Sequence, residues 1–394
     1  MTGESSNGVL MNDQSNDEVT RRRFLQGAAA VGVGSVATGL AGEAGPAAPK
    51  FPTHLLGRTK LRVSRIGIGG RSKRVLKLAV EAGINLVHSS TQYERGRAIR
   101  ALGATFAKNP GLRDKLVLCL KGKLKDLEGE LDHMLRCLHT DHADVYLPML
   151  VKPDERRLEH LMTVQDALQK KGKIRFKGFV CHSSLSDVFE MILAKAPGYF
   201  DAALVATRML IAAKYGKGGE VGRYVKNLAK LKAQGLGVIS MKSRSGQAMA
   251  QGAKVFQAHC KTVLAGGADT VLFTFANVQQ VHTVKGLDLS TTAMSDTERH
   301  LADAFHRSNG KACLMCGRCT QSCPRGLPVG DLMRIRMYHD EYGDVEYAQE
   351  TYRELDGDPA RMAAACESCT ACSNACPIGL AGAQTVRYVT SLFA

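Results

Sequence analysis

Residues 235–242 read Gly235-Leu236-Gly237-Val238-Ile239-Ser240-Met241-Lys242 and mark the passage from a helix to a strand. The preceding stretch, Val221–Gln234, is amphipathic, and a glycine directly after such a stretch is a common helix stop. The short apolar run Gly237–Met241 predicts a buried strand. A helix followed at once by a buried strand is typical of folds in which the two elements alternate.

This alternation extends in both directions, from residue 53 to about 305. Seven more strands are predicted at Val63–Ile68, Asn85–His88, Val117–Leu120, Asp144–Leu147, Phe176–Val180, Ala202–Val205 and Thr270–Phe273. Further helices are predicted at Val75–Ala82, Leu127–Leu138, Leu158–Lys171 and Leu185–Lys195. Eight strands alternating with helices over roughly 250 residues match a (β/α)8 TIM barrel, so the predicted fold class is α/β.

Eight of the 12 cysteines lie close together near the C-terminus. They form two runs of the same spacing, Cys313-x2-Cys316-x2-Cys319-x3-Cys323-Pro324 and Cys366-x2-Cys369-x2-Cys372-x3-Cys376-Pro377. Three cysteines at these gaps let a tight turn place three thiolates on one 4Fe-4S cluster, as in bacterial ferredoxins. In two-cluster ferredoxins the fourth cysteine of each run binds the other cluster. We therefore expect one cluster on Cys313, Cys316, Cys319 and Cys376, and a second on Cys366, Cys369, Cys372 and Cys323.

Zinc sites and disulfides are the alternatives for these cysteines. Zinc usually takes paired Cys-x2-Cys ligands, whereas a third cysteine followed by Cys-Pro has no use in one tetrahedral site. Disulfides would make the repeated spacing a coincidence. Helical segments at Val329–Tyr342 and Asp344–Leu355 separate the runs, which predicts a small α-helical ferredoxin-like domain over residues 306–394. The remaining cysteines fall in barrel elements, where we expect mostly buried thiols: Cys119, Cys137, Cys181 and Cys260.

Residues 1–50 resemble an export signal and linker. The segment Thr20-Arg21-Arg22-Arg23-Phe24-Leu25-Gln26 precedes Gly27–Gly42, a stretch of small and apolar residues. Paired arginines before such a stretch are typical of a twin-arginine signal, which a receptor reads and which is no permanent anchor. We therefore expect a periplasmic or otherwise exported protein that meets the membrane only during export. A membrane-spanning helix is the weaker alternative, because a span needs about 20 strongly apolar residues.

The positive charge of the chain is concentrated in the barrel segment. The net charge is +16, and residues 51–306 alone carry 40 Lys or Arg against 22 Asp or Glu. A basic face of this kind can attract nucleic acid, an anionic cofactor or an acidic redox partner. No nucleic-acid motif accompanies the charge, so we expect no nucleic-acid partner and interpret most of it as a solvated surface.

The barrel segment resembles the aldo/keto reductase family. The resemblance rests on four stretches: Leu56-Gly57-Arg58-Thr59 through Gly69-Gly70, Glu81–Asn85, Gly172–Arg175 into Gly178-Phe179, and Gly235–Lys242. It implies a barrel whose chemistry lies at the C-terminal ends of the strands. Similar helical cluster modules follow the barrel in one branch of the family's relatives, and the resemblance there includes Met333–Tyr338 and Glu341–Gly343.

The resemblance implies a catalytic set that is only half present. The family uses an Asp and a Tyr after the second strand, a Lys after the third and a His after the fourth. Tyr93 and Lys121 match, whereas His88 stands at the Asp position and Met149 at the His position. We predict Tyr93 as proton donor and Lys121 as the cation that favours its ionised form, with His88 as a substitute catalytic group. His182 is a second candidate substitute, although a single histidine at a barrel mouth is more often structural.

The predicted nucleotide pocket is altered as well. The Ser-Asn pair that holds the nicotinamide in the family falls on Val180 and Cys181. Lys242, Ser243 and Arg244 remain as candidate cofactor-binding residues that form a cradle for an anion. NADPH is therefore a doubtful cofactor, whereas two 4Fe-4S clusters are expected.

Three functions follow from these observations. The first is an exported iron-sulfur oxidoreductase, in which the clusters exchange electrons with a redox partner protein or small carrier and a small carbonyl-like substrate binds in the barrel mouth. The second is an NADPH-dependent reductase. The third is an electron-transfer subunit whose barrel has lost catalysis.

Overall fold

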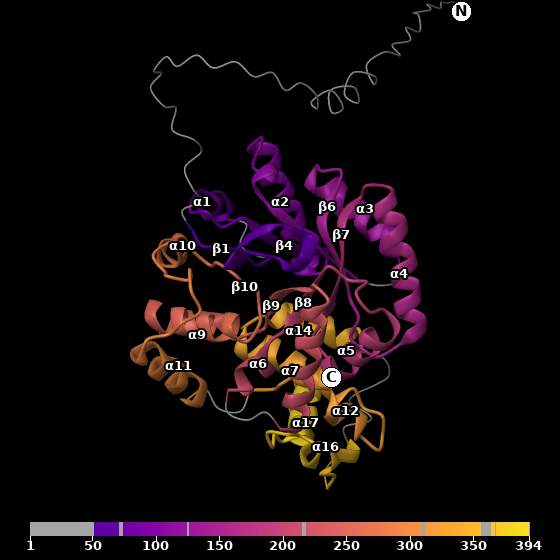
Figure 1. The fold of residues 1–394 in the computed structure, drawn as a ribbon. Coiled ribbons are helices and arrows are strands. Elements are labelled where there is room, and N and C mark those ends of the chain that lie inside the picture. The colour runs from indigo at the N-terminus through magenta and orange to yellow at the C-terminus, as the bar shows by residue number, and fades with distance from the viewer. Residues whose placement is uncertain are drawn as a thin grey trace, which may run out of the picture. The chain divides into compact units, whose positions relative to one another are not determined.

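Eight parallel strands close into a barrel in the computed structural model, which describes residues 51–70, 74–123, 126–214, 218–308, 312–355, 364–366 and 368–393 (Figure 1). Around the barrel the order is β10-β3-β4-β5-β6-β7-β8-β9, and the pair Val271 and Ile66 closes the ring. The strands are β3 (Ile66–Ile68), β4 (Leu86–Ser90), β5 (Val117–Gly122), β6 (Ala143–Pro148), β7 (Ile174–Cys181), β8 (Ala202–Ala206), β9 (Gly237–Met241) and β10 (Thr270–Phe273). The predicted α/β barrel is confirmed.

Amphipathic helices surround the strands. Capping side chains fix where two of them begin: Asp126 accepts a hydrogen bond from the Gly129 N–H at α3, and Asp154 accepts one from the Arg157 N–H at α4. The helices are α1 (Leu76–Glu81), α2 (Arg97–Lys108), α3 (Leu127–Leu138), α4 (Glu155–Lys170), α5 (Leu185–Lys195), α6 (Arg208–Ala212), α7 (Gly219–Ala233), α8 (Ser245–Ala250), α9 (Ala253–Ala265), α10 (Val278–Lys285) and α11 (Asp296–Ser308). The five predicted barrel helices are present within three residues at each end.

The predicted strand Val63–Ile68 is wrong, because the chain breaks there into two elements. β2 (Arg62–Ser64) pairs antiparallel with β1 (Thr53–Leu55), and only β3 enters the barrel. The side-chain oxygen of Asn85 accepts the Ser64 N–H at 2.7 Å, and the Ser64 hydroxyl donates to the Ile66 carbonyl oxygen at 2.6 Å. These bonds hold the chain where β2 ends and β3 begins, and an apolar pattern alone does not reveal such a break.

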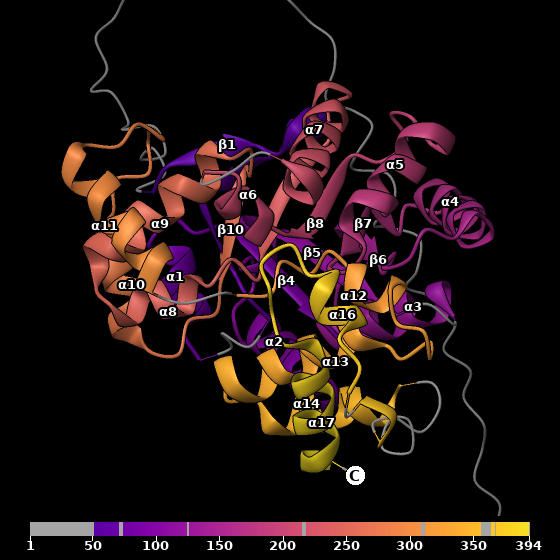
Figure 2. The ribbon, with the colours of Figure 1, turned by 90° about the horizontal axis from the view of Figure 1, so that it is seen from below.

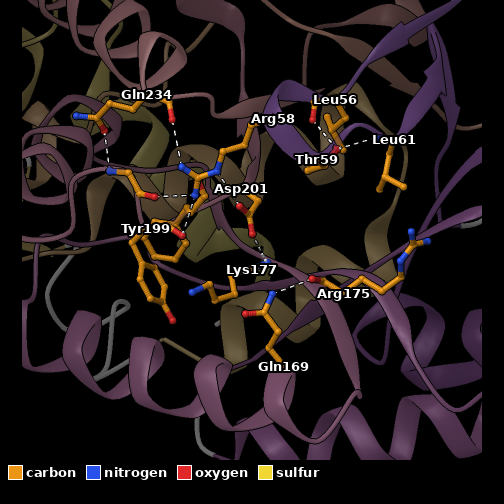
Figure 3. A network of polar contacts seen from close by, with 12 residues as sticks. Leu56, Arg58, Thr59, Leu61, Gln169, Arg175, Lys177, Tyr199, Asp201 and Gln234 are labelled. Carbon is orange, nitrogen blue, oxygen red and sulfur yellow. Dashed lines mark hydrogen bonds and ion pairs between the residues drawn. The ribbon is translucent and has the colours of Figure 1, made fainter.

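The hairpin β1–β2 closes the end of the barrel at which the strands begin. Its connection contains the short helix η1 (Gly57–Thr59), and Arg58 reaches from there to Asp201 at 2.9 Å and to the Gly198 carbonyl oxygen at 2.6 Å (Figure 3). Leu56 and Val63 pack into the barrel interior. In barrels of this fold, the end at which the strands begin serves stability. The active site is therefore expected at the opposite end.

The C-terminal helices lie at that opposite end, beneath the barrel in Figure 1 and in front of it in Figure 2. They are α12 (Arg318–Gln321), α13 (Val329–Arg336), the π-helix η4 (Met337–Glu341), α14 (Val345–Arg353), η5 (Ala364–Cys366), α16 (Ala371–Asn374) and α17 (Gly382–Phe393). The predicted helix Val329–Tyr342 is present, but its second half is π-helical. Ion pairs tie this domain to the barrel, among them Arg97–Glu346 at 3.1 Å and Arg208–Glu341 at 2.7 Å.

Barrel and C-terminal helices belong to one compact unit. In the described part of the chain, no helix combines the length and apolar character needed to cross a membrane. The predicted export signal, with Arg21, Arg22 and Gly27–Gly42, lies outside the described residues.

Candidate functional site

A cavity of about 530 Å³ opens at the C-terminal ends of the barrel strands. His88 reaches it from β4, Lys121 from β5, and Tyr93 from the turn η2 (Tyr93–Gly96) after β4. The three residues after β9 that were predicted to bind a cofactor line the same cavity: Lys242, Ser243 and Arg244. The fold therefore brings the predicted catalytic and cofactor-binding residues into one site.

Lys121 lies beside the aromatic ring of Tyr93. The Lys121 Nζ lies 5.5 Å from the centre of the Tyr93 ring, as in a cation–π contact. Burial lowers the pKa of Lys121 to about 7, and the positive charge of Arg334 acts in the same direction. A lysine with such a pKa can take up or release a proton near neutral pH.

Two buried histidines have polar atoms without a partner. His88 is 2% exposed and His182 is 3% exposed, and both line the cavity. Burial lowers the pKa of His88 to about 3 and that of His182 well below its usual value, so both are neutral at pH 7. Within the described residues, His88 Nε2 and His182 Nδ1 bind no protein group. Buried polar atoms are rarely left unpaired, which makes these two atoms candidate contacts for a ligand.

The roof of the cavity comes from the C-terminal domain. Lys242 Nζ donates to the Tyr338 hydroxyl at 2.6 Å, and the rings of Tyr338 and Tyr347 lie 4.7 Å apart. Tyr347 in turn faces Tyr93, with ring centres 6.4 Å apart. Sequence reasoning gave these tyrosines no role. Arg334, Tyr338 and Tyr342 recur at intervals of four, which predicts a shared helix face but does not indicate which site that face meets.

Arg208 connects the cavity wall to the first cysteine run. It is 3% exposed and binds three groups: the Glu341 carboxylate at 2.7 Å, the Lys242 carbonyl oxygen at 2.9 Å and the Cys313 carbonyl oxygen at 3.4 Å. Glu341 balances its charge. This buried arginine was also absent from the sequence-based site.

The positions that differ from the family's pattern are apolar in the structure as well. Met149 forms a bridge to Val180 after β6, and Val180 is fully buried. The Cys181 thiol contacts the Ser183 carbonyl oxygen at 3.2 Å, and burial raises its pKa to about 12. Neither Val180 nor Cys181 offers the amide and hydroxyl groups that would hold a nicotinamide carboxamide.

The first quartet is defined here as Cys313, Cys316, Cys319 and Cys376. All four line one cavity, although Cys376 comes from the second run. Burial raises the pKa of Cys316 to about 11, and the charges of Cys313 and Cys376 add to this rise. The Met315 N–H points to Cys313 Sγ at 3.4 Å, and the Leu380 N–H points to Cys376 Sγ at 3.3 Å. Backbone N–H groups aimed at sulfur suit a cluster ligand.

The second quartet is Cys366, Cys369, Cys372 and Cys323. Burial raises the pKa of Cys366, and the nearby thiolates of the other three members add to the rise. Arg387 of α17 donates to the Cys366 carbonyl oxygen at 2.8 Å. Cys323 of the first run thus lies near the cysteines of the second run, although Cys372 also lines the cavity of the first quartet. The assignment of these cysteines to two clusters stays a prediction.

The chemistry of these donors fits a four-iron cluster. All 12 cysteines lie in the described residues and none forms a disulfide. Among the described residues, no three His, Cys, Asp or Glu side chains converge on a single metal ion. A four-iron cluster takes one thiolate on each iron, so its ligands surround a space instead of converging on a point. The cavity of the first quartet has this arrangement.

His182 separates the cavity of the first quartet from the barrel cavity. It lines both of them. The neighbouring loop packs tightly on the first cysteine run, because a Cβ on Gly317 would lie only 2.5 Å from the Ser184 hydroxyl. One side chain therefore stands between the two sites.

Comparisons with known proteins agree with this architecture. Residues 70–242 match the model of the aldo/keto reductase family, and residues 309–380 match that of the 4Fe-4S dicluster domain. The chain is an iron-sulfur oxidoreductase. Its dicluster match supports iron-sulfur clusters in the C-terminal domain. No curated protein is significantly similar to the oxidoreductase in sequence.

Solved structures share the barrel of the oxidoreductase. An aldo-keto reductase from Bacillus halodurans in its holo form is 15% identical, with 64% of this chain and 96% of that chain covered and a TM-score of 0.51. A chain described as an aldo-keto reductase from Pseudomonas aeruginosa is 19% identical, with 59% and 92% covered and a TM-score of 0.46. The Bacillus structure shows that the fold is shared.

Proposed function

We propose that the oxidoreductase exchanges electrons between an outside redox partner and a small carbonyl-like substrate in the barrel cavity, through two 4Fe-4S clusters on the two quartets. The observation that carries the proposal is the position of His182, which lines both the barrel cavity and the cavity of the first quartet. Electron transfer requires a short distance between donor and acceptor. A single side chain between the two cavities keeps that distance short. When bound, the clusters supply one-electron chemistry.

The barrel residues handle the protons of this reaction. Reduction of a carbonyl group to an alcohol consumes two electrons, from a one-electron carrier outside the protein, and two protons. Tyr93 gives its phenolic proton to the carbonyl oxygen, and Lys121 favours the resulting phenolate. The pKa of Lys121, about 7, suits this task near neutral pH. The second proton, bound for carbon, comes from solvent, and oxidation of an alcohol runs through the same groups in reverse.

The same proposal assigns the electrons to the clusters and not to NADPH. Val180 and Cys181 stand where the family holds the nicotinamide, and both are fully buried without a free amide or hydroxyl group. We also propose that residues 1–50 direct export by the twin-arginine route, on the strength of Arg21 and Arg22 before the apolar stretch. Outside the cytoplasm there is no regenerated NADPH pool, so a redox protein or small carrier would be the electron partner.

An anaerobic titration of the reconstituted full chain tests this function. We expect about eight irons per chain, as two clusters of four require. A reduced viologen should bleach the visible absorption of the clusters, and NADPH should leave it unchanged. Rapid bleaching by NADPH would overturn the proposal and favour an NADPH-dependent reductase.

A Tyr93→Phe variant tests whether the protein is an enzyme or only an electron-transfer subunit. The substitution removes the proton donor but keeps the ring that contacts Lys121 and Tyr347. General acid catalysis contributes about a hundredfold or more, so substrate turnover should fall by at least that factor while viologen still reduces the clusters. Unchanged turnover would favour the non-catalytic electron-transfer subunit.

A further inference from the structure

We infer that the barrel cavity binds a substrate bearing a carboxylate group, and that Lys121 and Lys242 hold that group. The inference rests on the proposed function and names the class of its substrate. It starts from the charges that line the cavity and from buried polar atoms that have no protein partner.

The cavity is lined by two lysines that form no salt bridge among the described residues. Lys121 is 5% exposed, and the described part of the chain gives it no salt bridge. Lys242 donates to the neutral hydroxyl of Tyr338. The two lysines are close enough that the charge of Lys121 lowers the pKa of Lys242, after the larger effect of burial. A buried ammonium group without an anion is costly, and an anionic ligand would remove that cost.

The two carboxylates on the cavity wall are already engaged. Glu341 is paired with Arg208 at 2.7 Å. The Asp344 side chain caps α14, where it accepts the Tyr347 N–H at 3.3 Å. Neither carboxylate has a salt bridge to Lys121 or Lys242 among the described residues. Glu130 and Glu354 act on Lys121 only through space, and Glu130 already accepts hydrogen bonds from the Thr91 hydroxyl and the Lys123 N–H. A bound anion would supply the lysines with a direct counter-charge.

Buried histidine atoms give a second, independent reason to expect a polar ligand. His88 Nε2 and His182 Nδ1 are buried at the wall of the cavity and bind no group of the described protein. A small molecule with a carboxylate and an adjacent carbonyl group offers oxygens both to the lysines and to these nitrogens. A small 2-oxo acid has this chemistry, and a cavity of about 530 Å³ accommodates it.

The competing explanation is that the lysines balance the negative charge of a cluster on the first quartet. Arg208 is better placed for that role, because it binds the Cys313 carbonyl oxygen. Lys121 instead lies over the ring of Tyr93, on β5. The two explanations predict different behaviour of a Lys121 variant.

Equilibrium dialysis of the oxidised, cluster-loaded full chain against labelled pyruvate tests the inference. Methyl pyruvate, which keeps the carbonyl group but lacks the charge, is the neutral comparison. We expect Lys121→Met and Lys242→Met each to weaken pyruvate binding by about tenfold to a hundredfold, the usual value of a hydrogen bond to a charged group. Methyl pyruvate should bind weakly to every variant.

Lys123→Met is the matched control. Lys123 lies two residues further along, is exposed, and forms an ion pair with Glu354 outside the cavity. The substitution removes the same charge, so pyruvate binding should stay unchanged. Binding to the oxidised protein involves no electron transfer. Pyruvate binding can therefore fail while the proposed function holds, and the proposed function can fail while pyruvate still binds.

The pH dependence of pyruvate binding gives a second readout. The carboxylate binds the protonated lysine, whose pKa is about 7 without ligand. Affinity should therefore be greatest below pH 7 and fall as the pH rises through 7, and Lys121→Met should remove this fall. The groups that face Lys121 include His88, whose pKa burial lowers to about 3, and Glu130, whose pKa burial raises. Arg334, Lys123 and Glu354 act on Lys121 through their charges, and the Tyr93 ring lies beneath its ammonium group.

Three outcomes would overturn the inference. Methyl pyruvate could bind as tightly as pyruvate, or both lysine variants could bind pyruvate like the unaltered chain. Lys121→Met could also change the potential of the clusters while leaving pyruvate binding intact, which would assign the lysine to the clusters.

Discussion

The two cysteine quartets differ in what surrounds them. The first quartet shares its cavity with His182 and Ser183 of the barrel and lies next to the substrate cavity. The second quartet contacts α17 of the C-terminal domain through Arg387 and through Gly382 beside Cys372, and of its four cysteines only Cys372 lines the cavity that His182 borders. Under the proposed function, this difference predicts a sequence of electron flow, with the second quartet exchanging electrons with the outside partner and the first with the substrate.

Replacing one cysteine in each quartet should give the largest effect and tests whether the two quartets differ in role. Cys316→Ser and Cys369→Ser should each lower the iron content from about eight to about four per chain. Only Cys316→Ser should also abolish substrate reduction when viologen supplies the electrons, because viologen can still reach the first quartet directly in Cys369→Ser. Iron analysis and anaerobic turnover assays measure both effects.

Cys137→Ser is the control for the cysteine variants. Cys137 lies on α3, away from both quartets, and should lose neither iron nor turnover. Equal turnover in Cys316→Ser and Cys369→Ser would show that the two quartets do not act in sequence.

A His182→Leu variant sharpens the comparison, because the cavity that His182 borders is lined by all four cysteines of the first quartet but by Cys372 alone of the second. The variant loses a neutral ring that can hydrogen-bond to substrate, which is worth about tenfold. Reoxidation of viologen-reduced clusters by substrate should slow by that factor in stopped-flow absorption, whereas the preceding reduction by viologen should keep its rate. Slowing of both phases would indicate structural damage.

A pair of glycine variants gives the smallest expected effect. Gly317 and Gly326 both have positive φ, at 81° and 67°, so alanine strains the backbone at either position by about 1 kcal/mol. Only Gly317→Ala also drives a Cβ to 2.5 Å from the Ser184 hydroxyl on the barrel side. Overpacking of this kind costs about 1–3 kcal/mol more, so thermal unfolding of Gly317→Ala should occur below that of Gly326→Ala. Equal midpoints would mean that the first run does not press on the barrel.

Much of the fold was predictable because its signals are local. The strands Gly237–Met241 and Thr270–Phe273 and the helices Leu127–Leu138 and Leu185–Lys195 have the predicted bounds. Each is a short apolar run or an amphipathic stretch with a clear stop. The break after Ser64 was not predictable, since it involves a hydrogen bond that the Ser64 N–H donates to Asn85, 21 positions away.

The candidate site was predictable only where it lies on the barrel strands. His88, Tyr93 and Lys121 could be placed because the ends of neighbouring parallel strands meet at one mouth. Tyr338 and Arg208 could not, because their part in the site depends on how the C-terminal domain docks. The spacing of residues within one segment does not indicate whether that segment lines a cavity in another domain.

The π-helix η4 and the helix after it make the roof of the barrel cavity, and they belong to the domain that holds both quartets. Under the proposed function, substrate selection and electron supply would thus both depend on the C-terminal domain. Grafting another dicluster domain onto this barrel would exchange Tyr338, Glu341 and Tyr347 together with the cysteines. Such a chimera would bind different substrates and would also exchange electrons with a different carrier. The two properties would therefore change together.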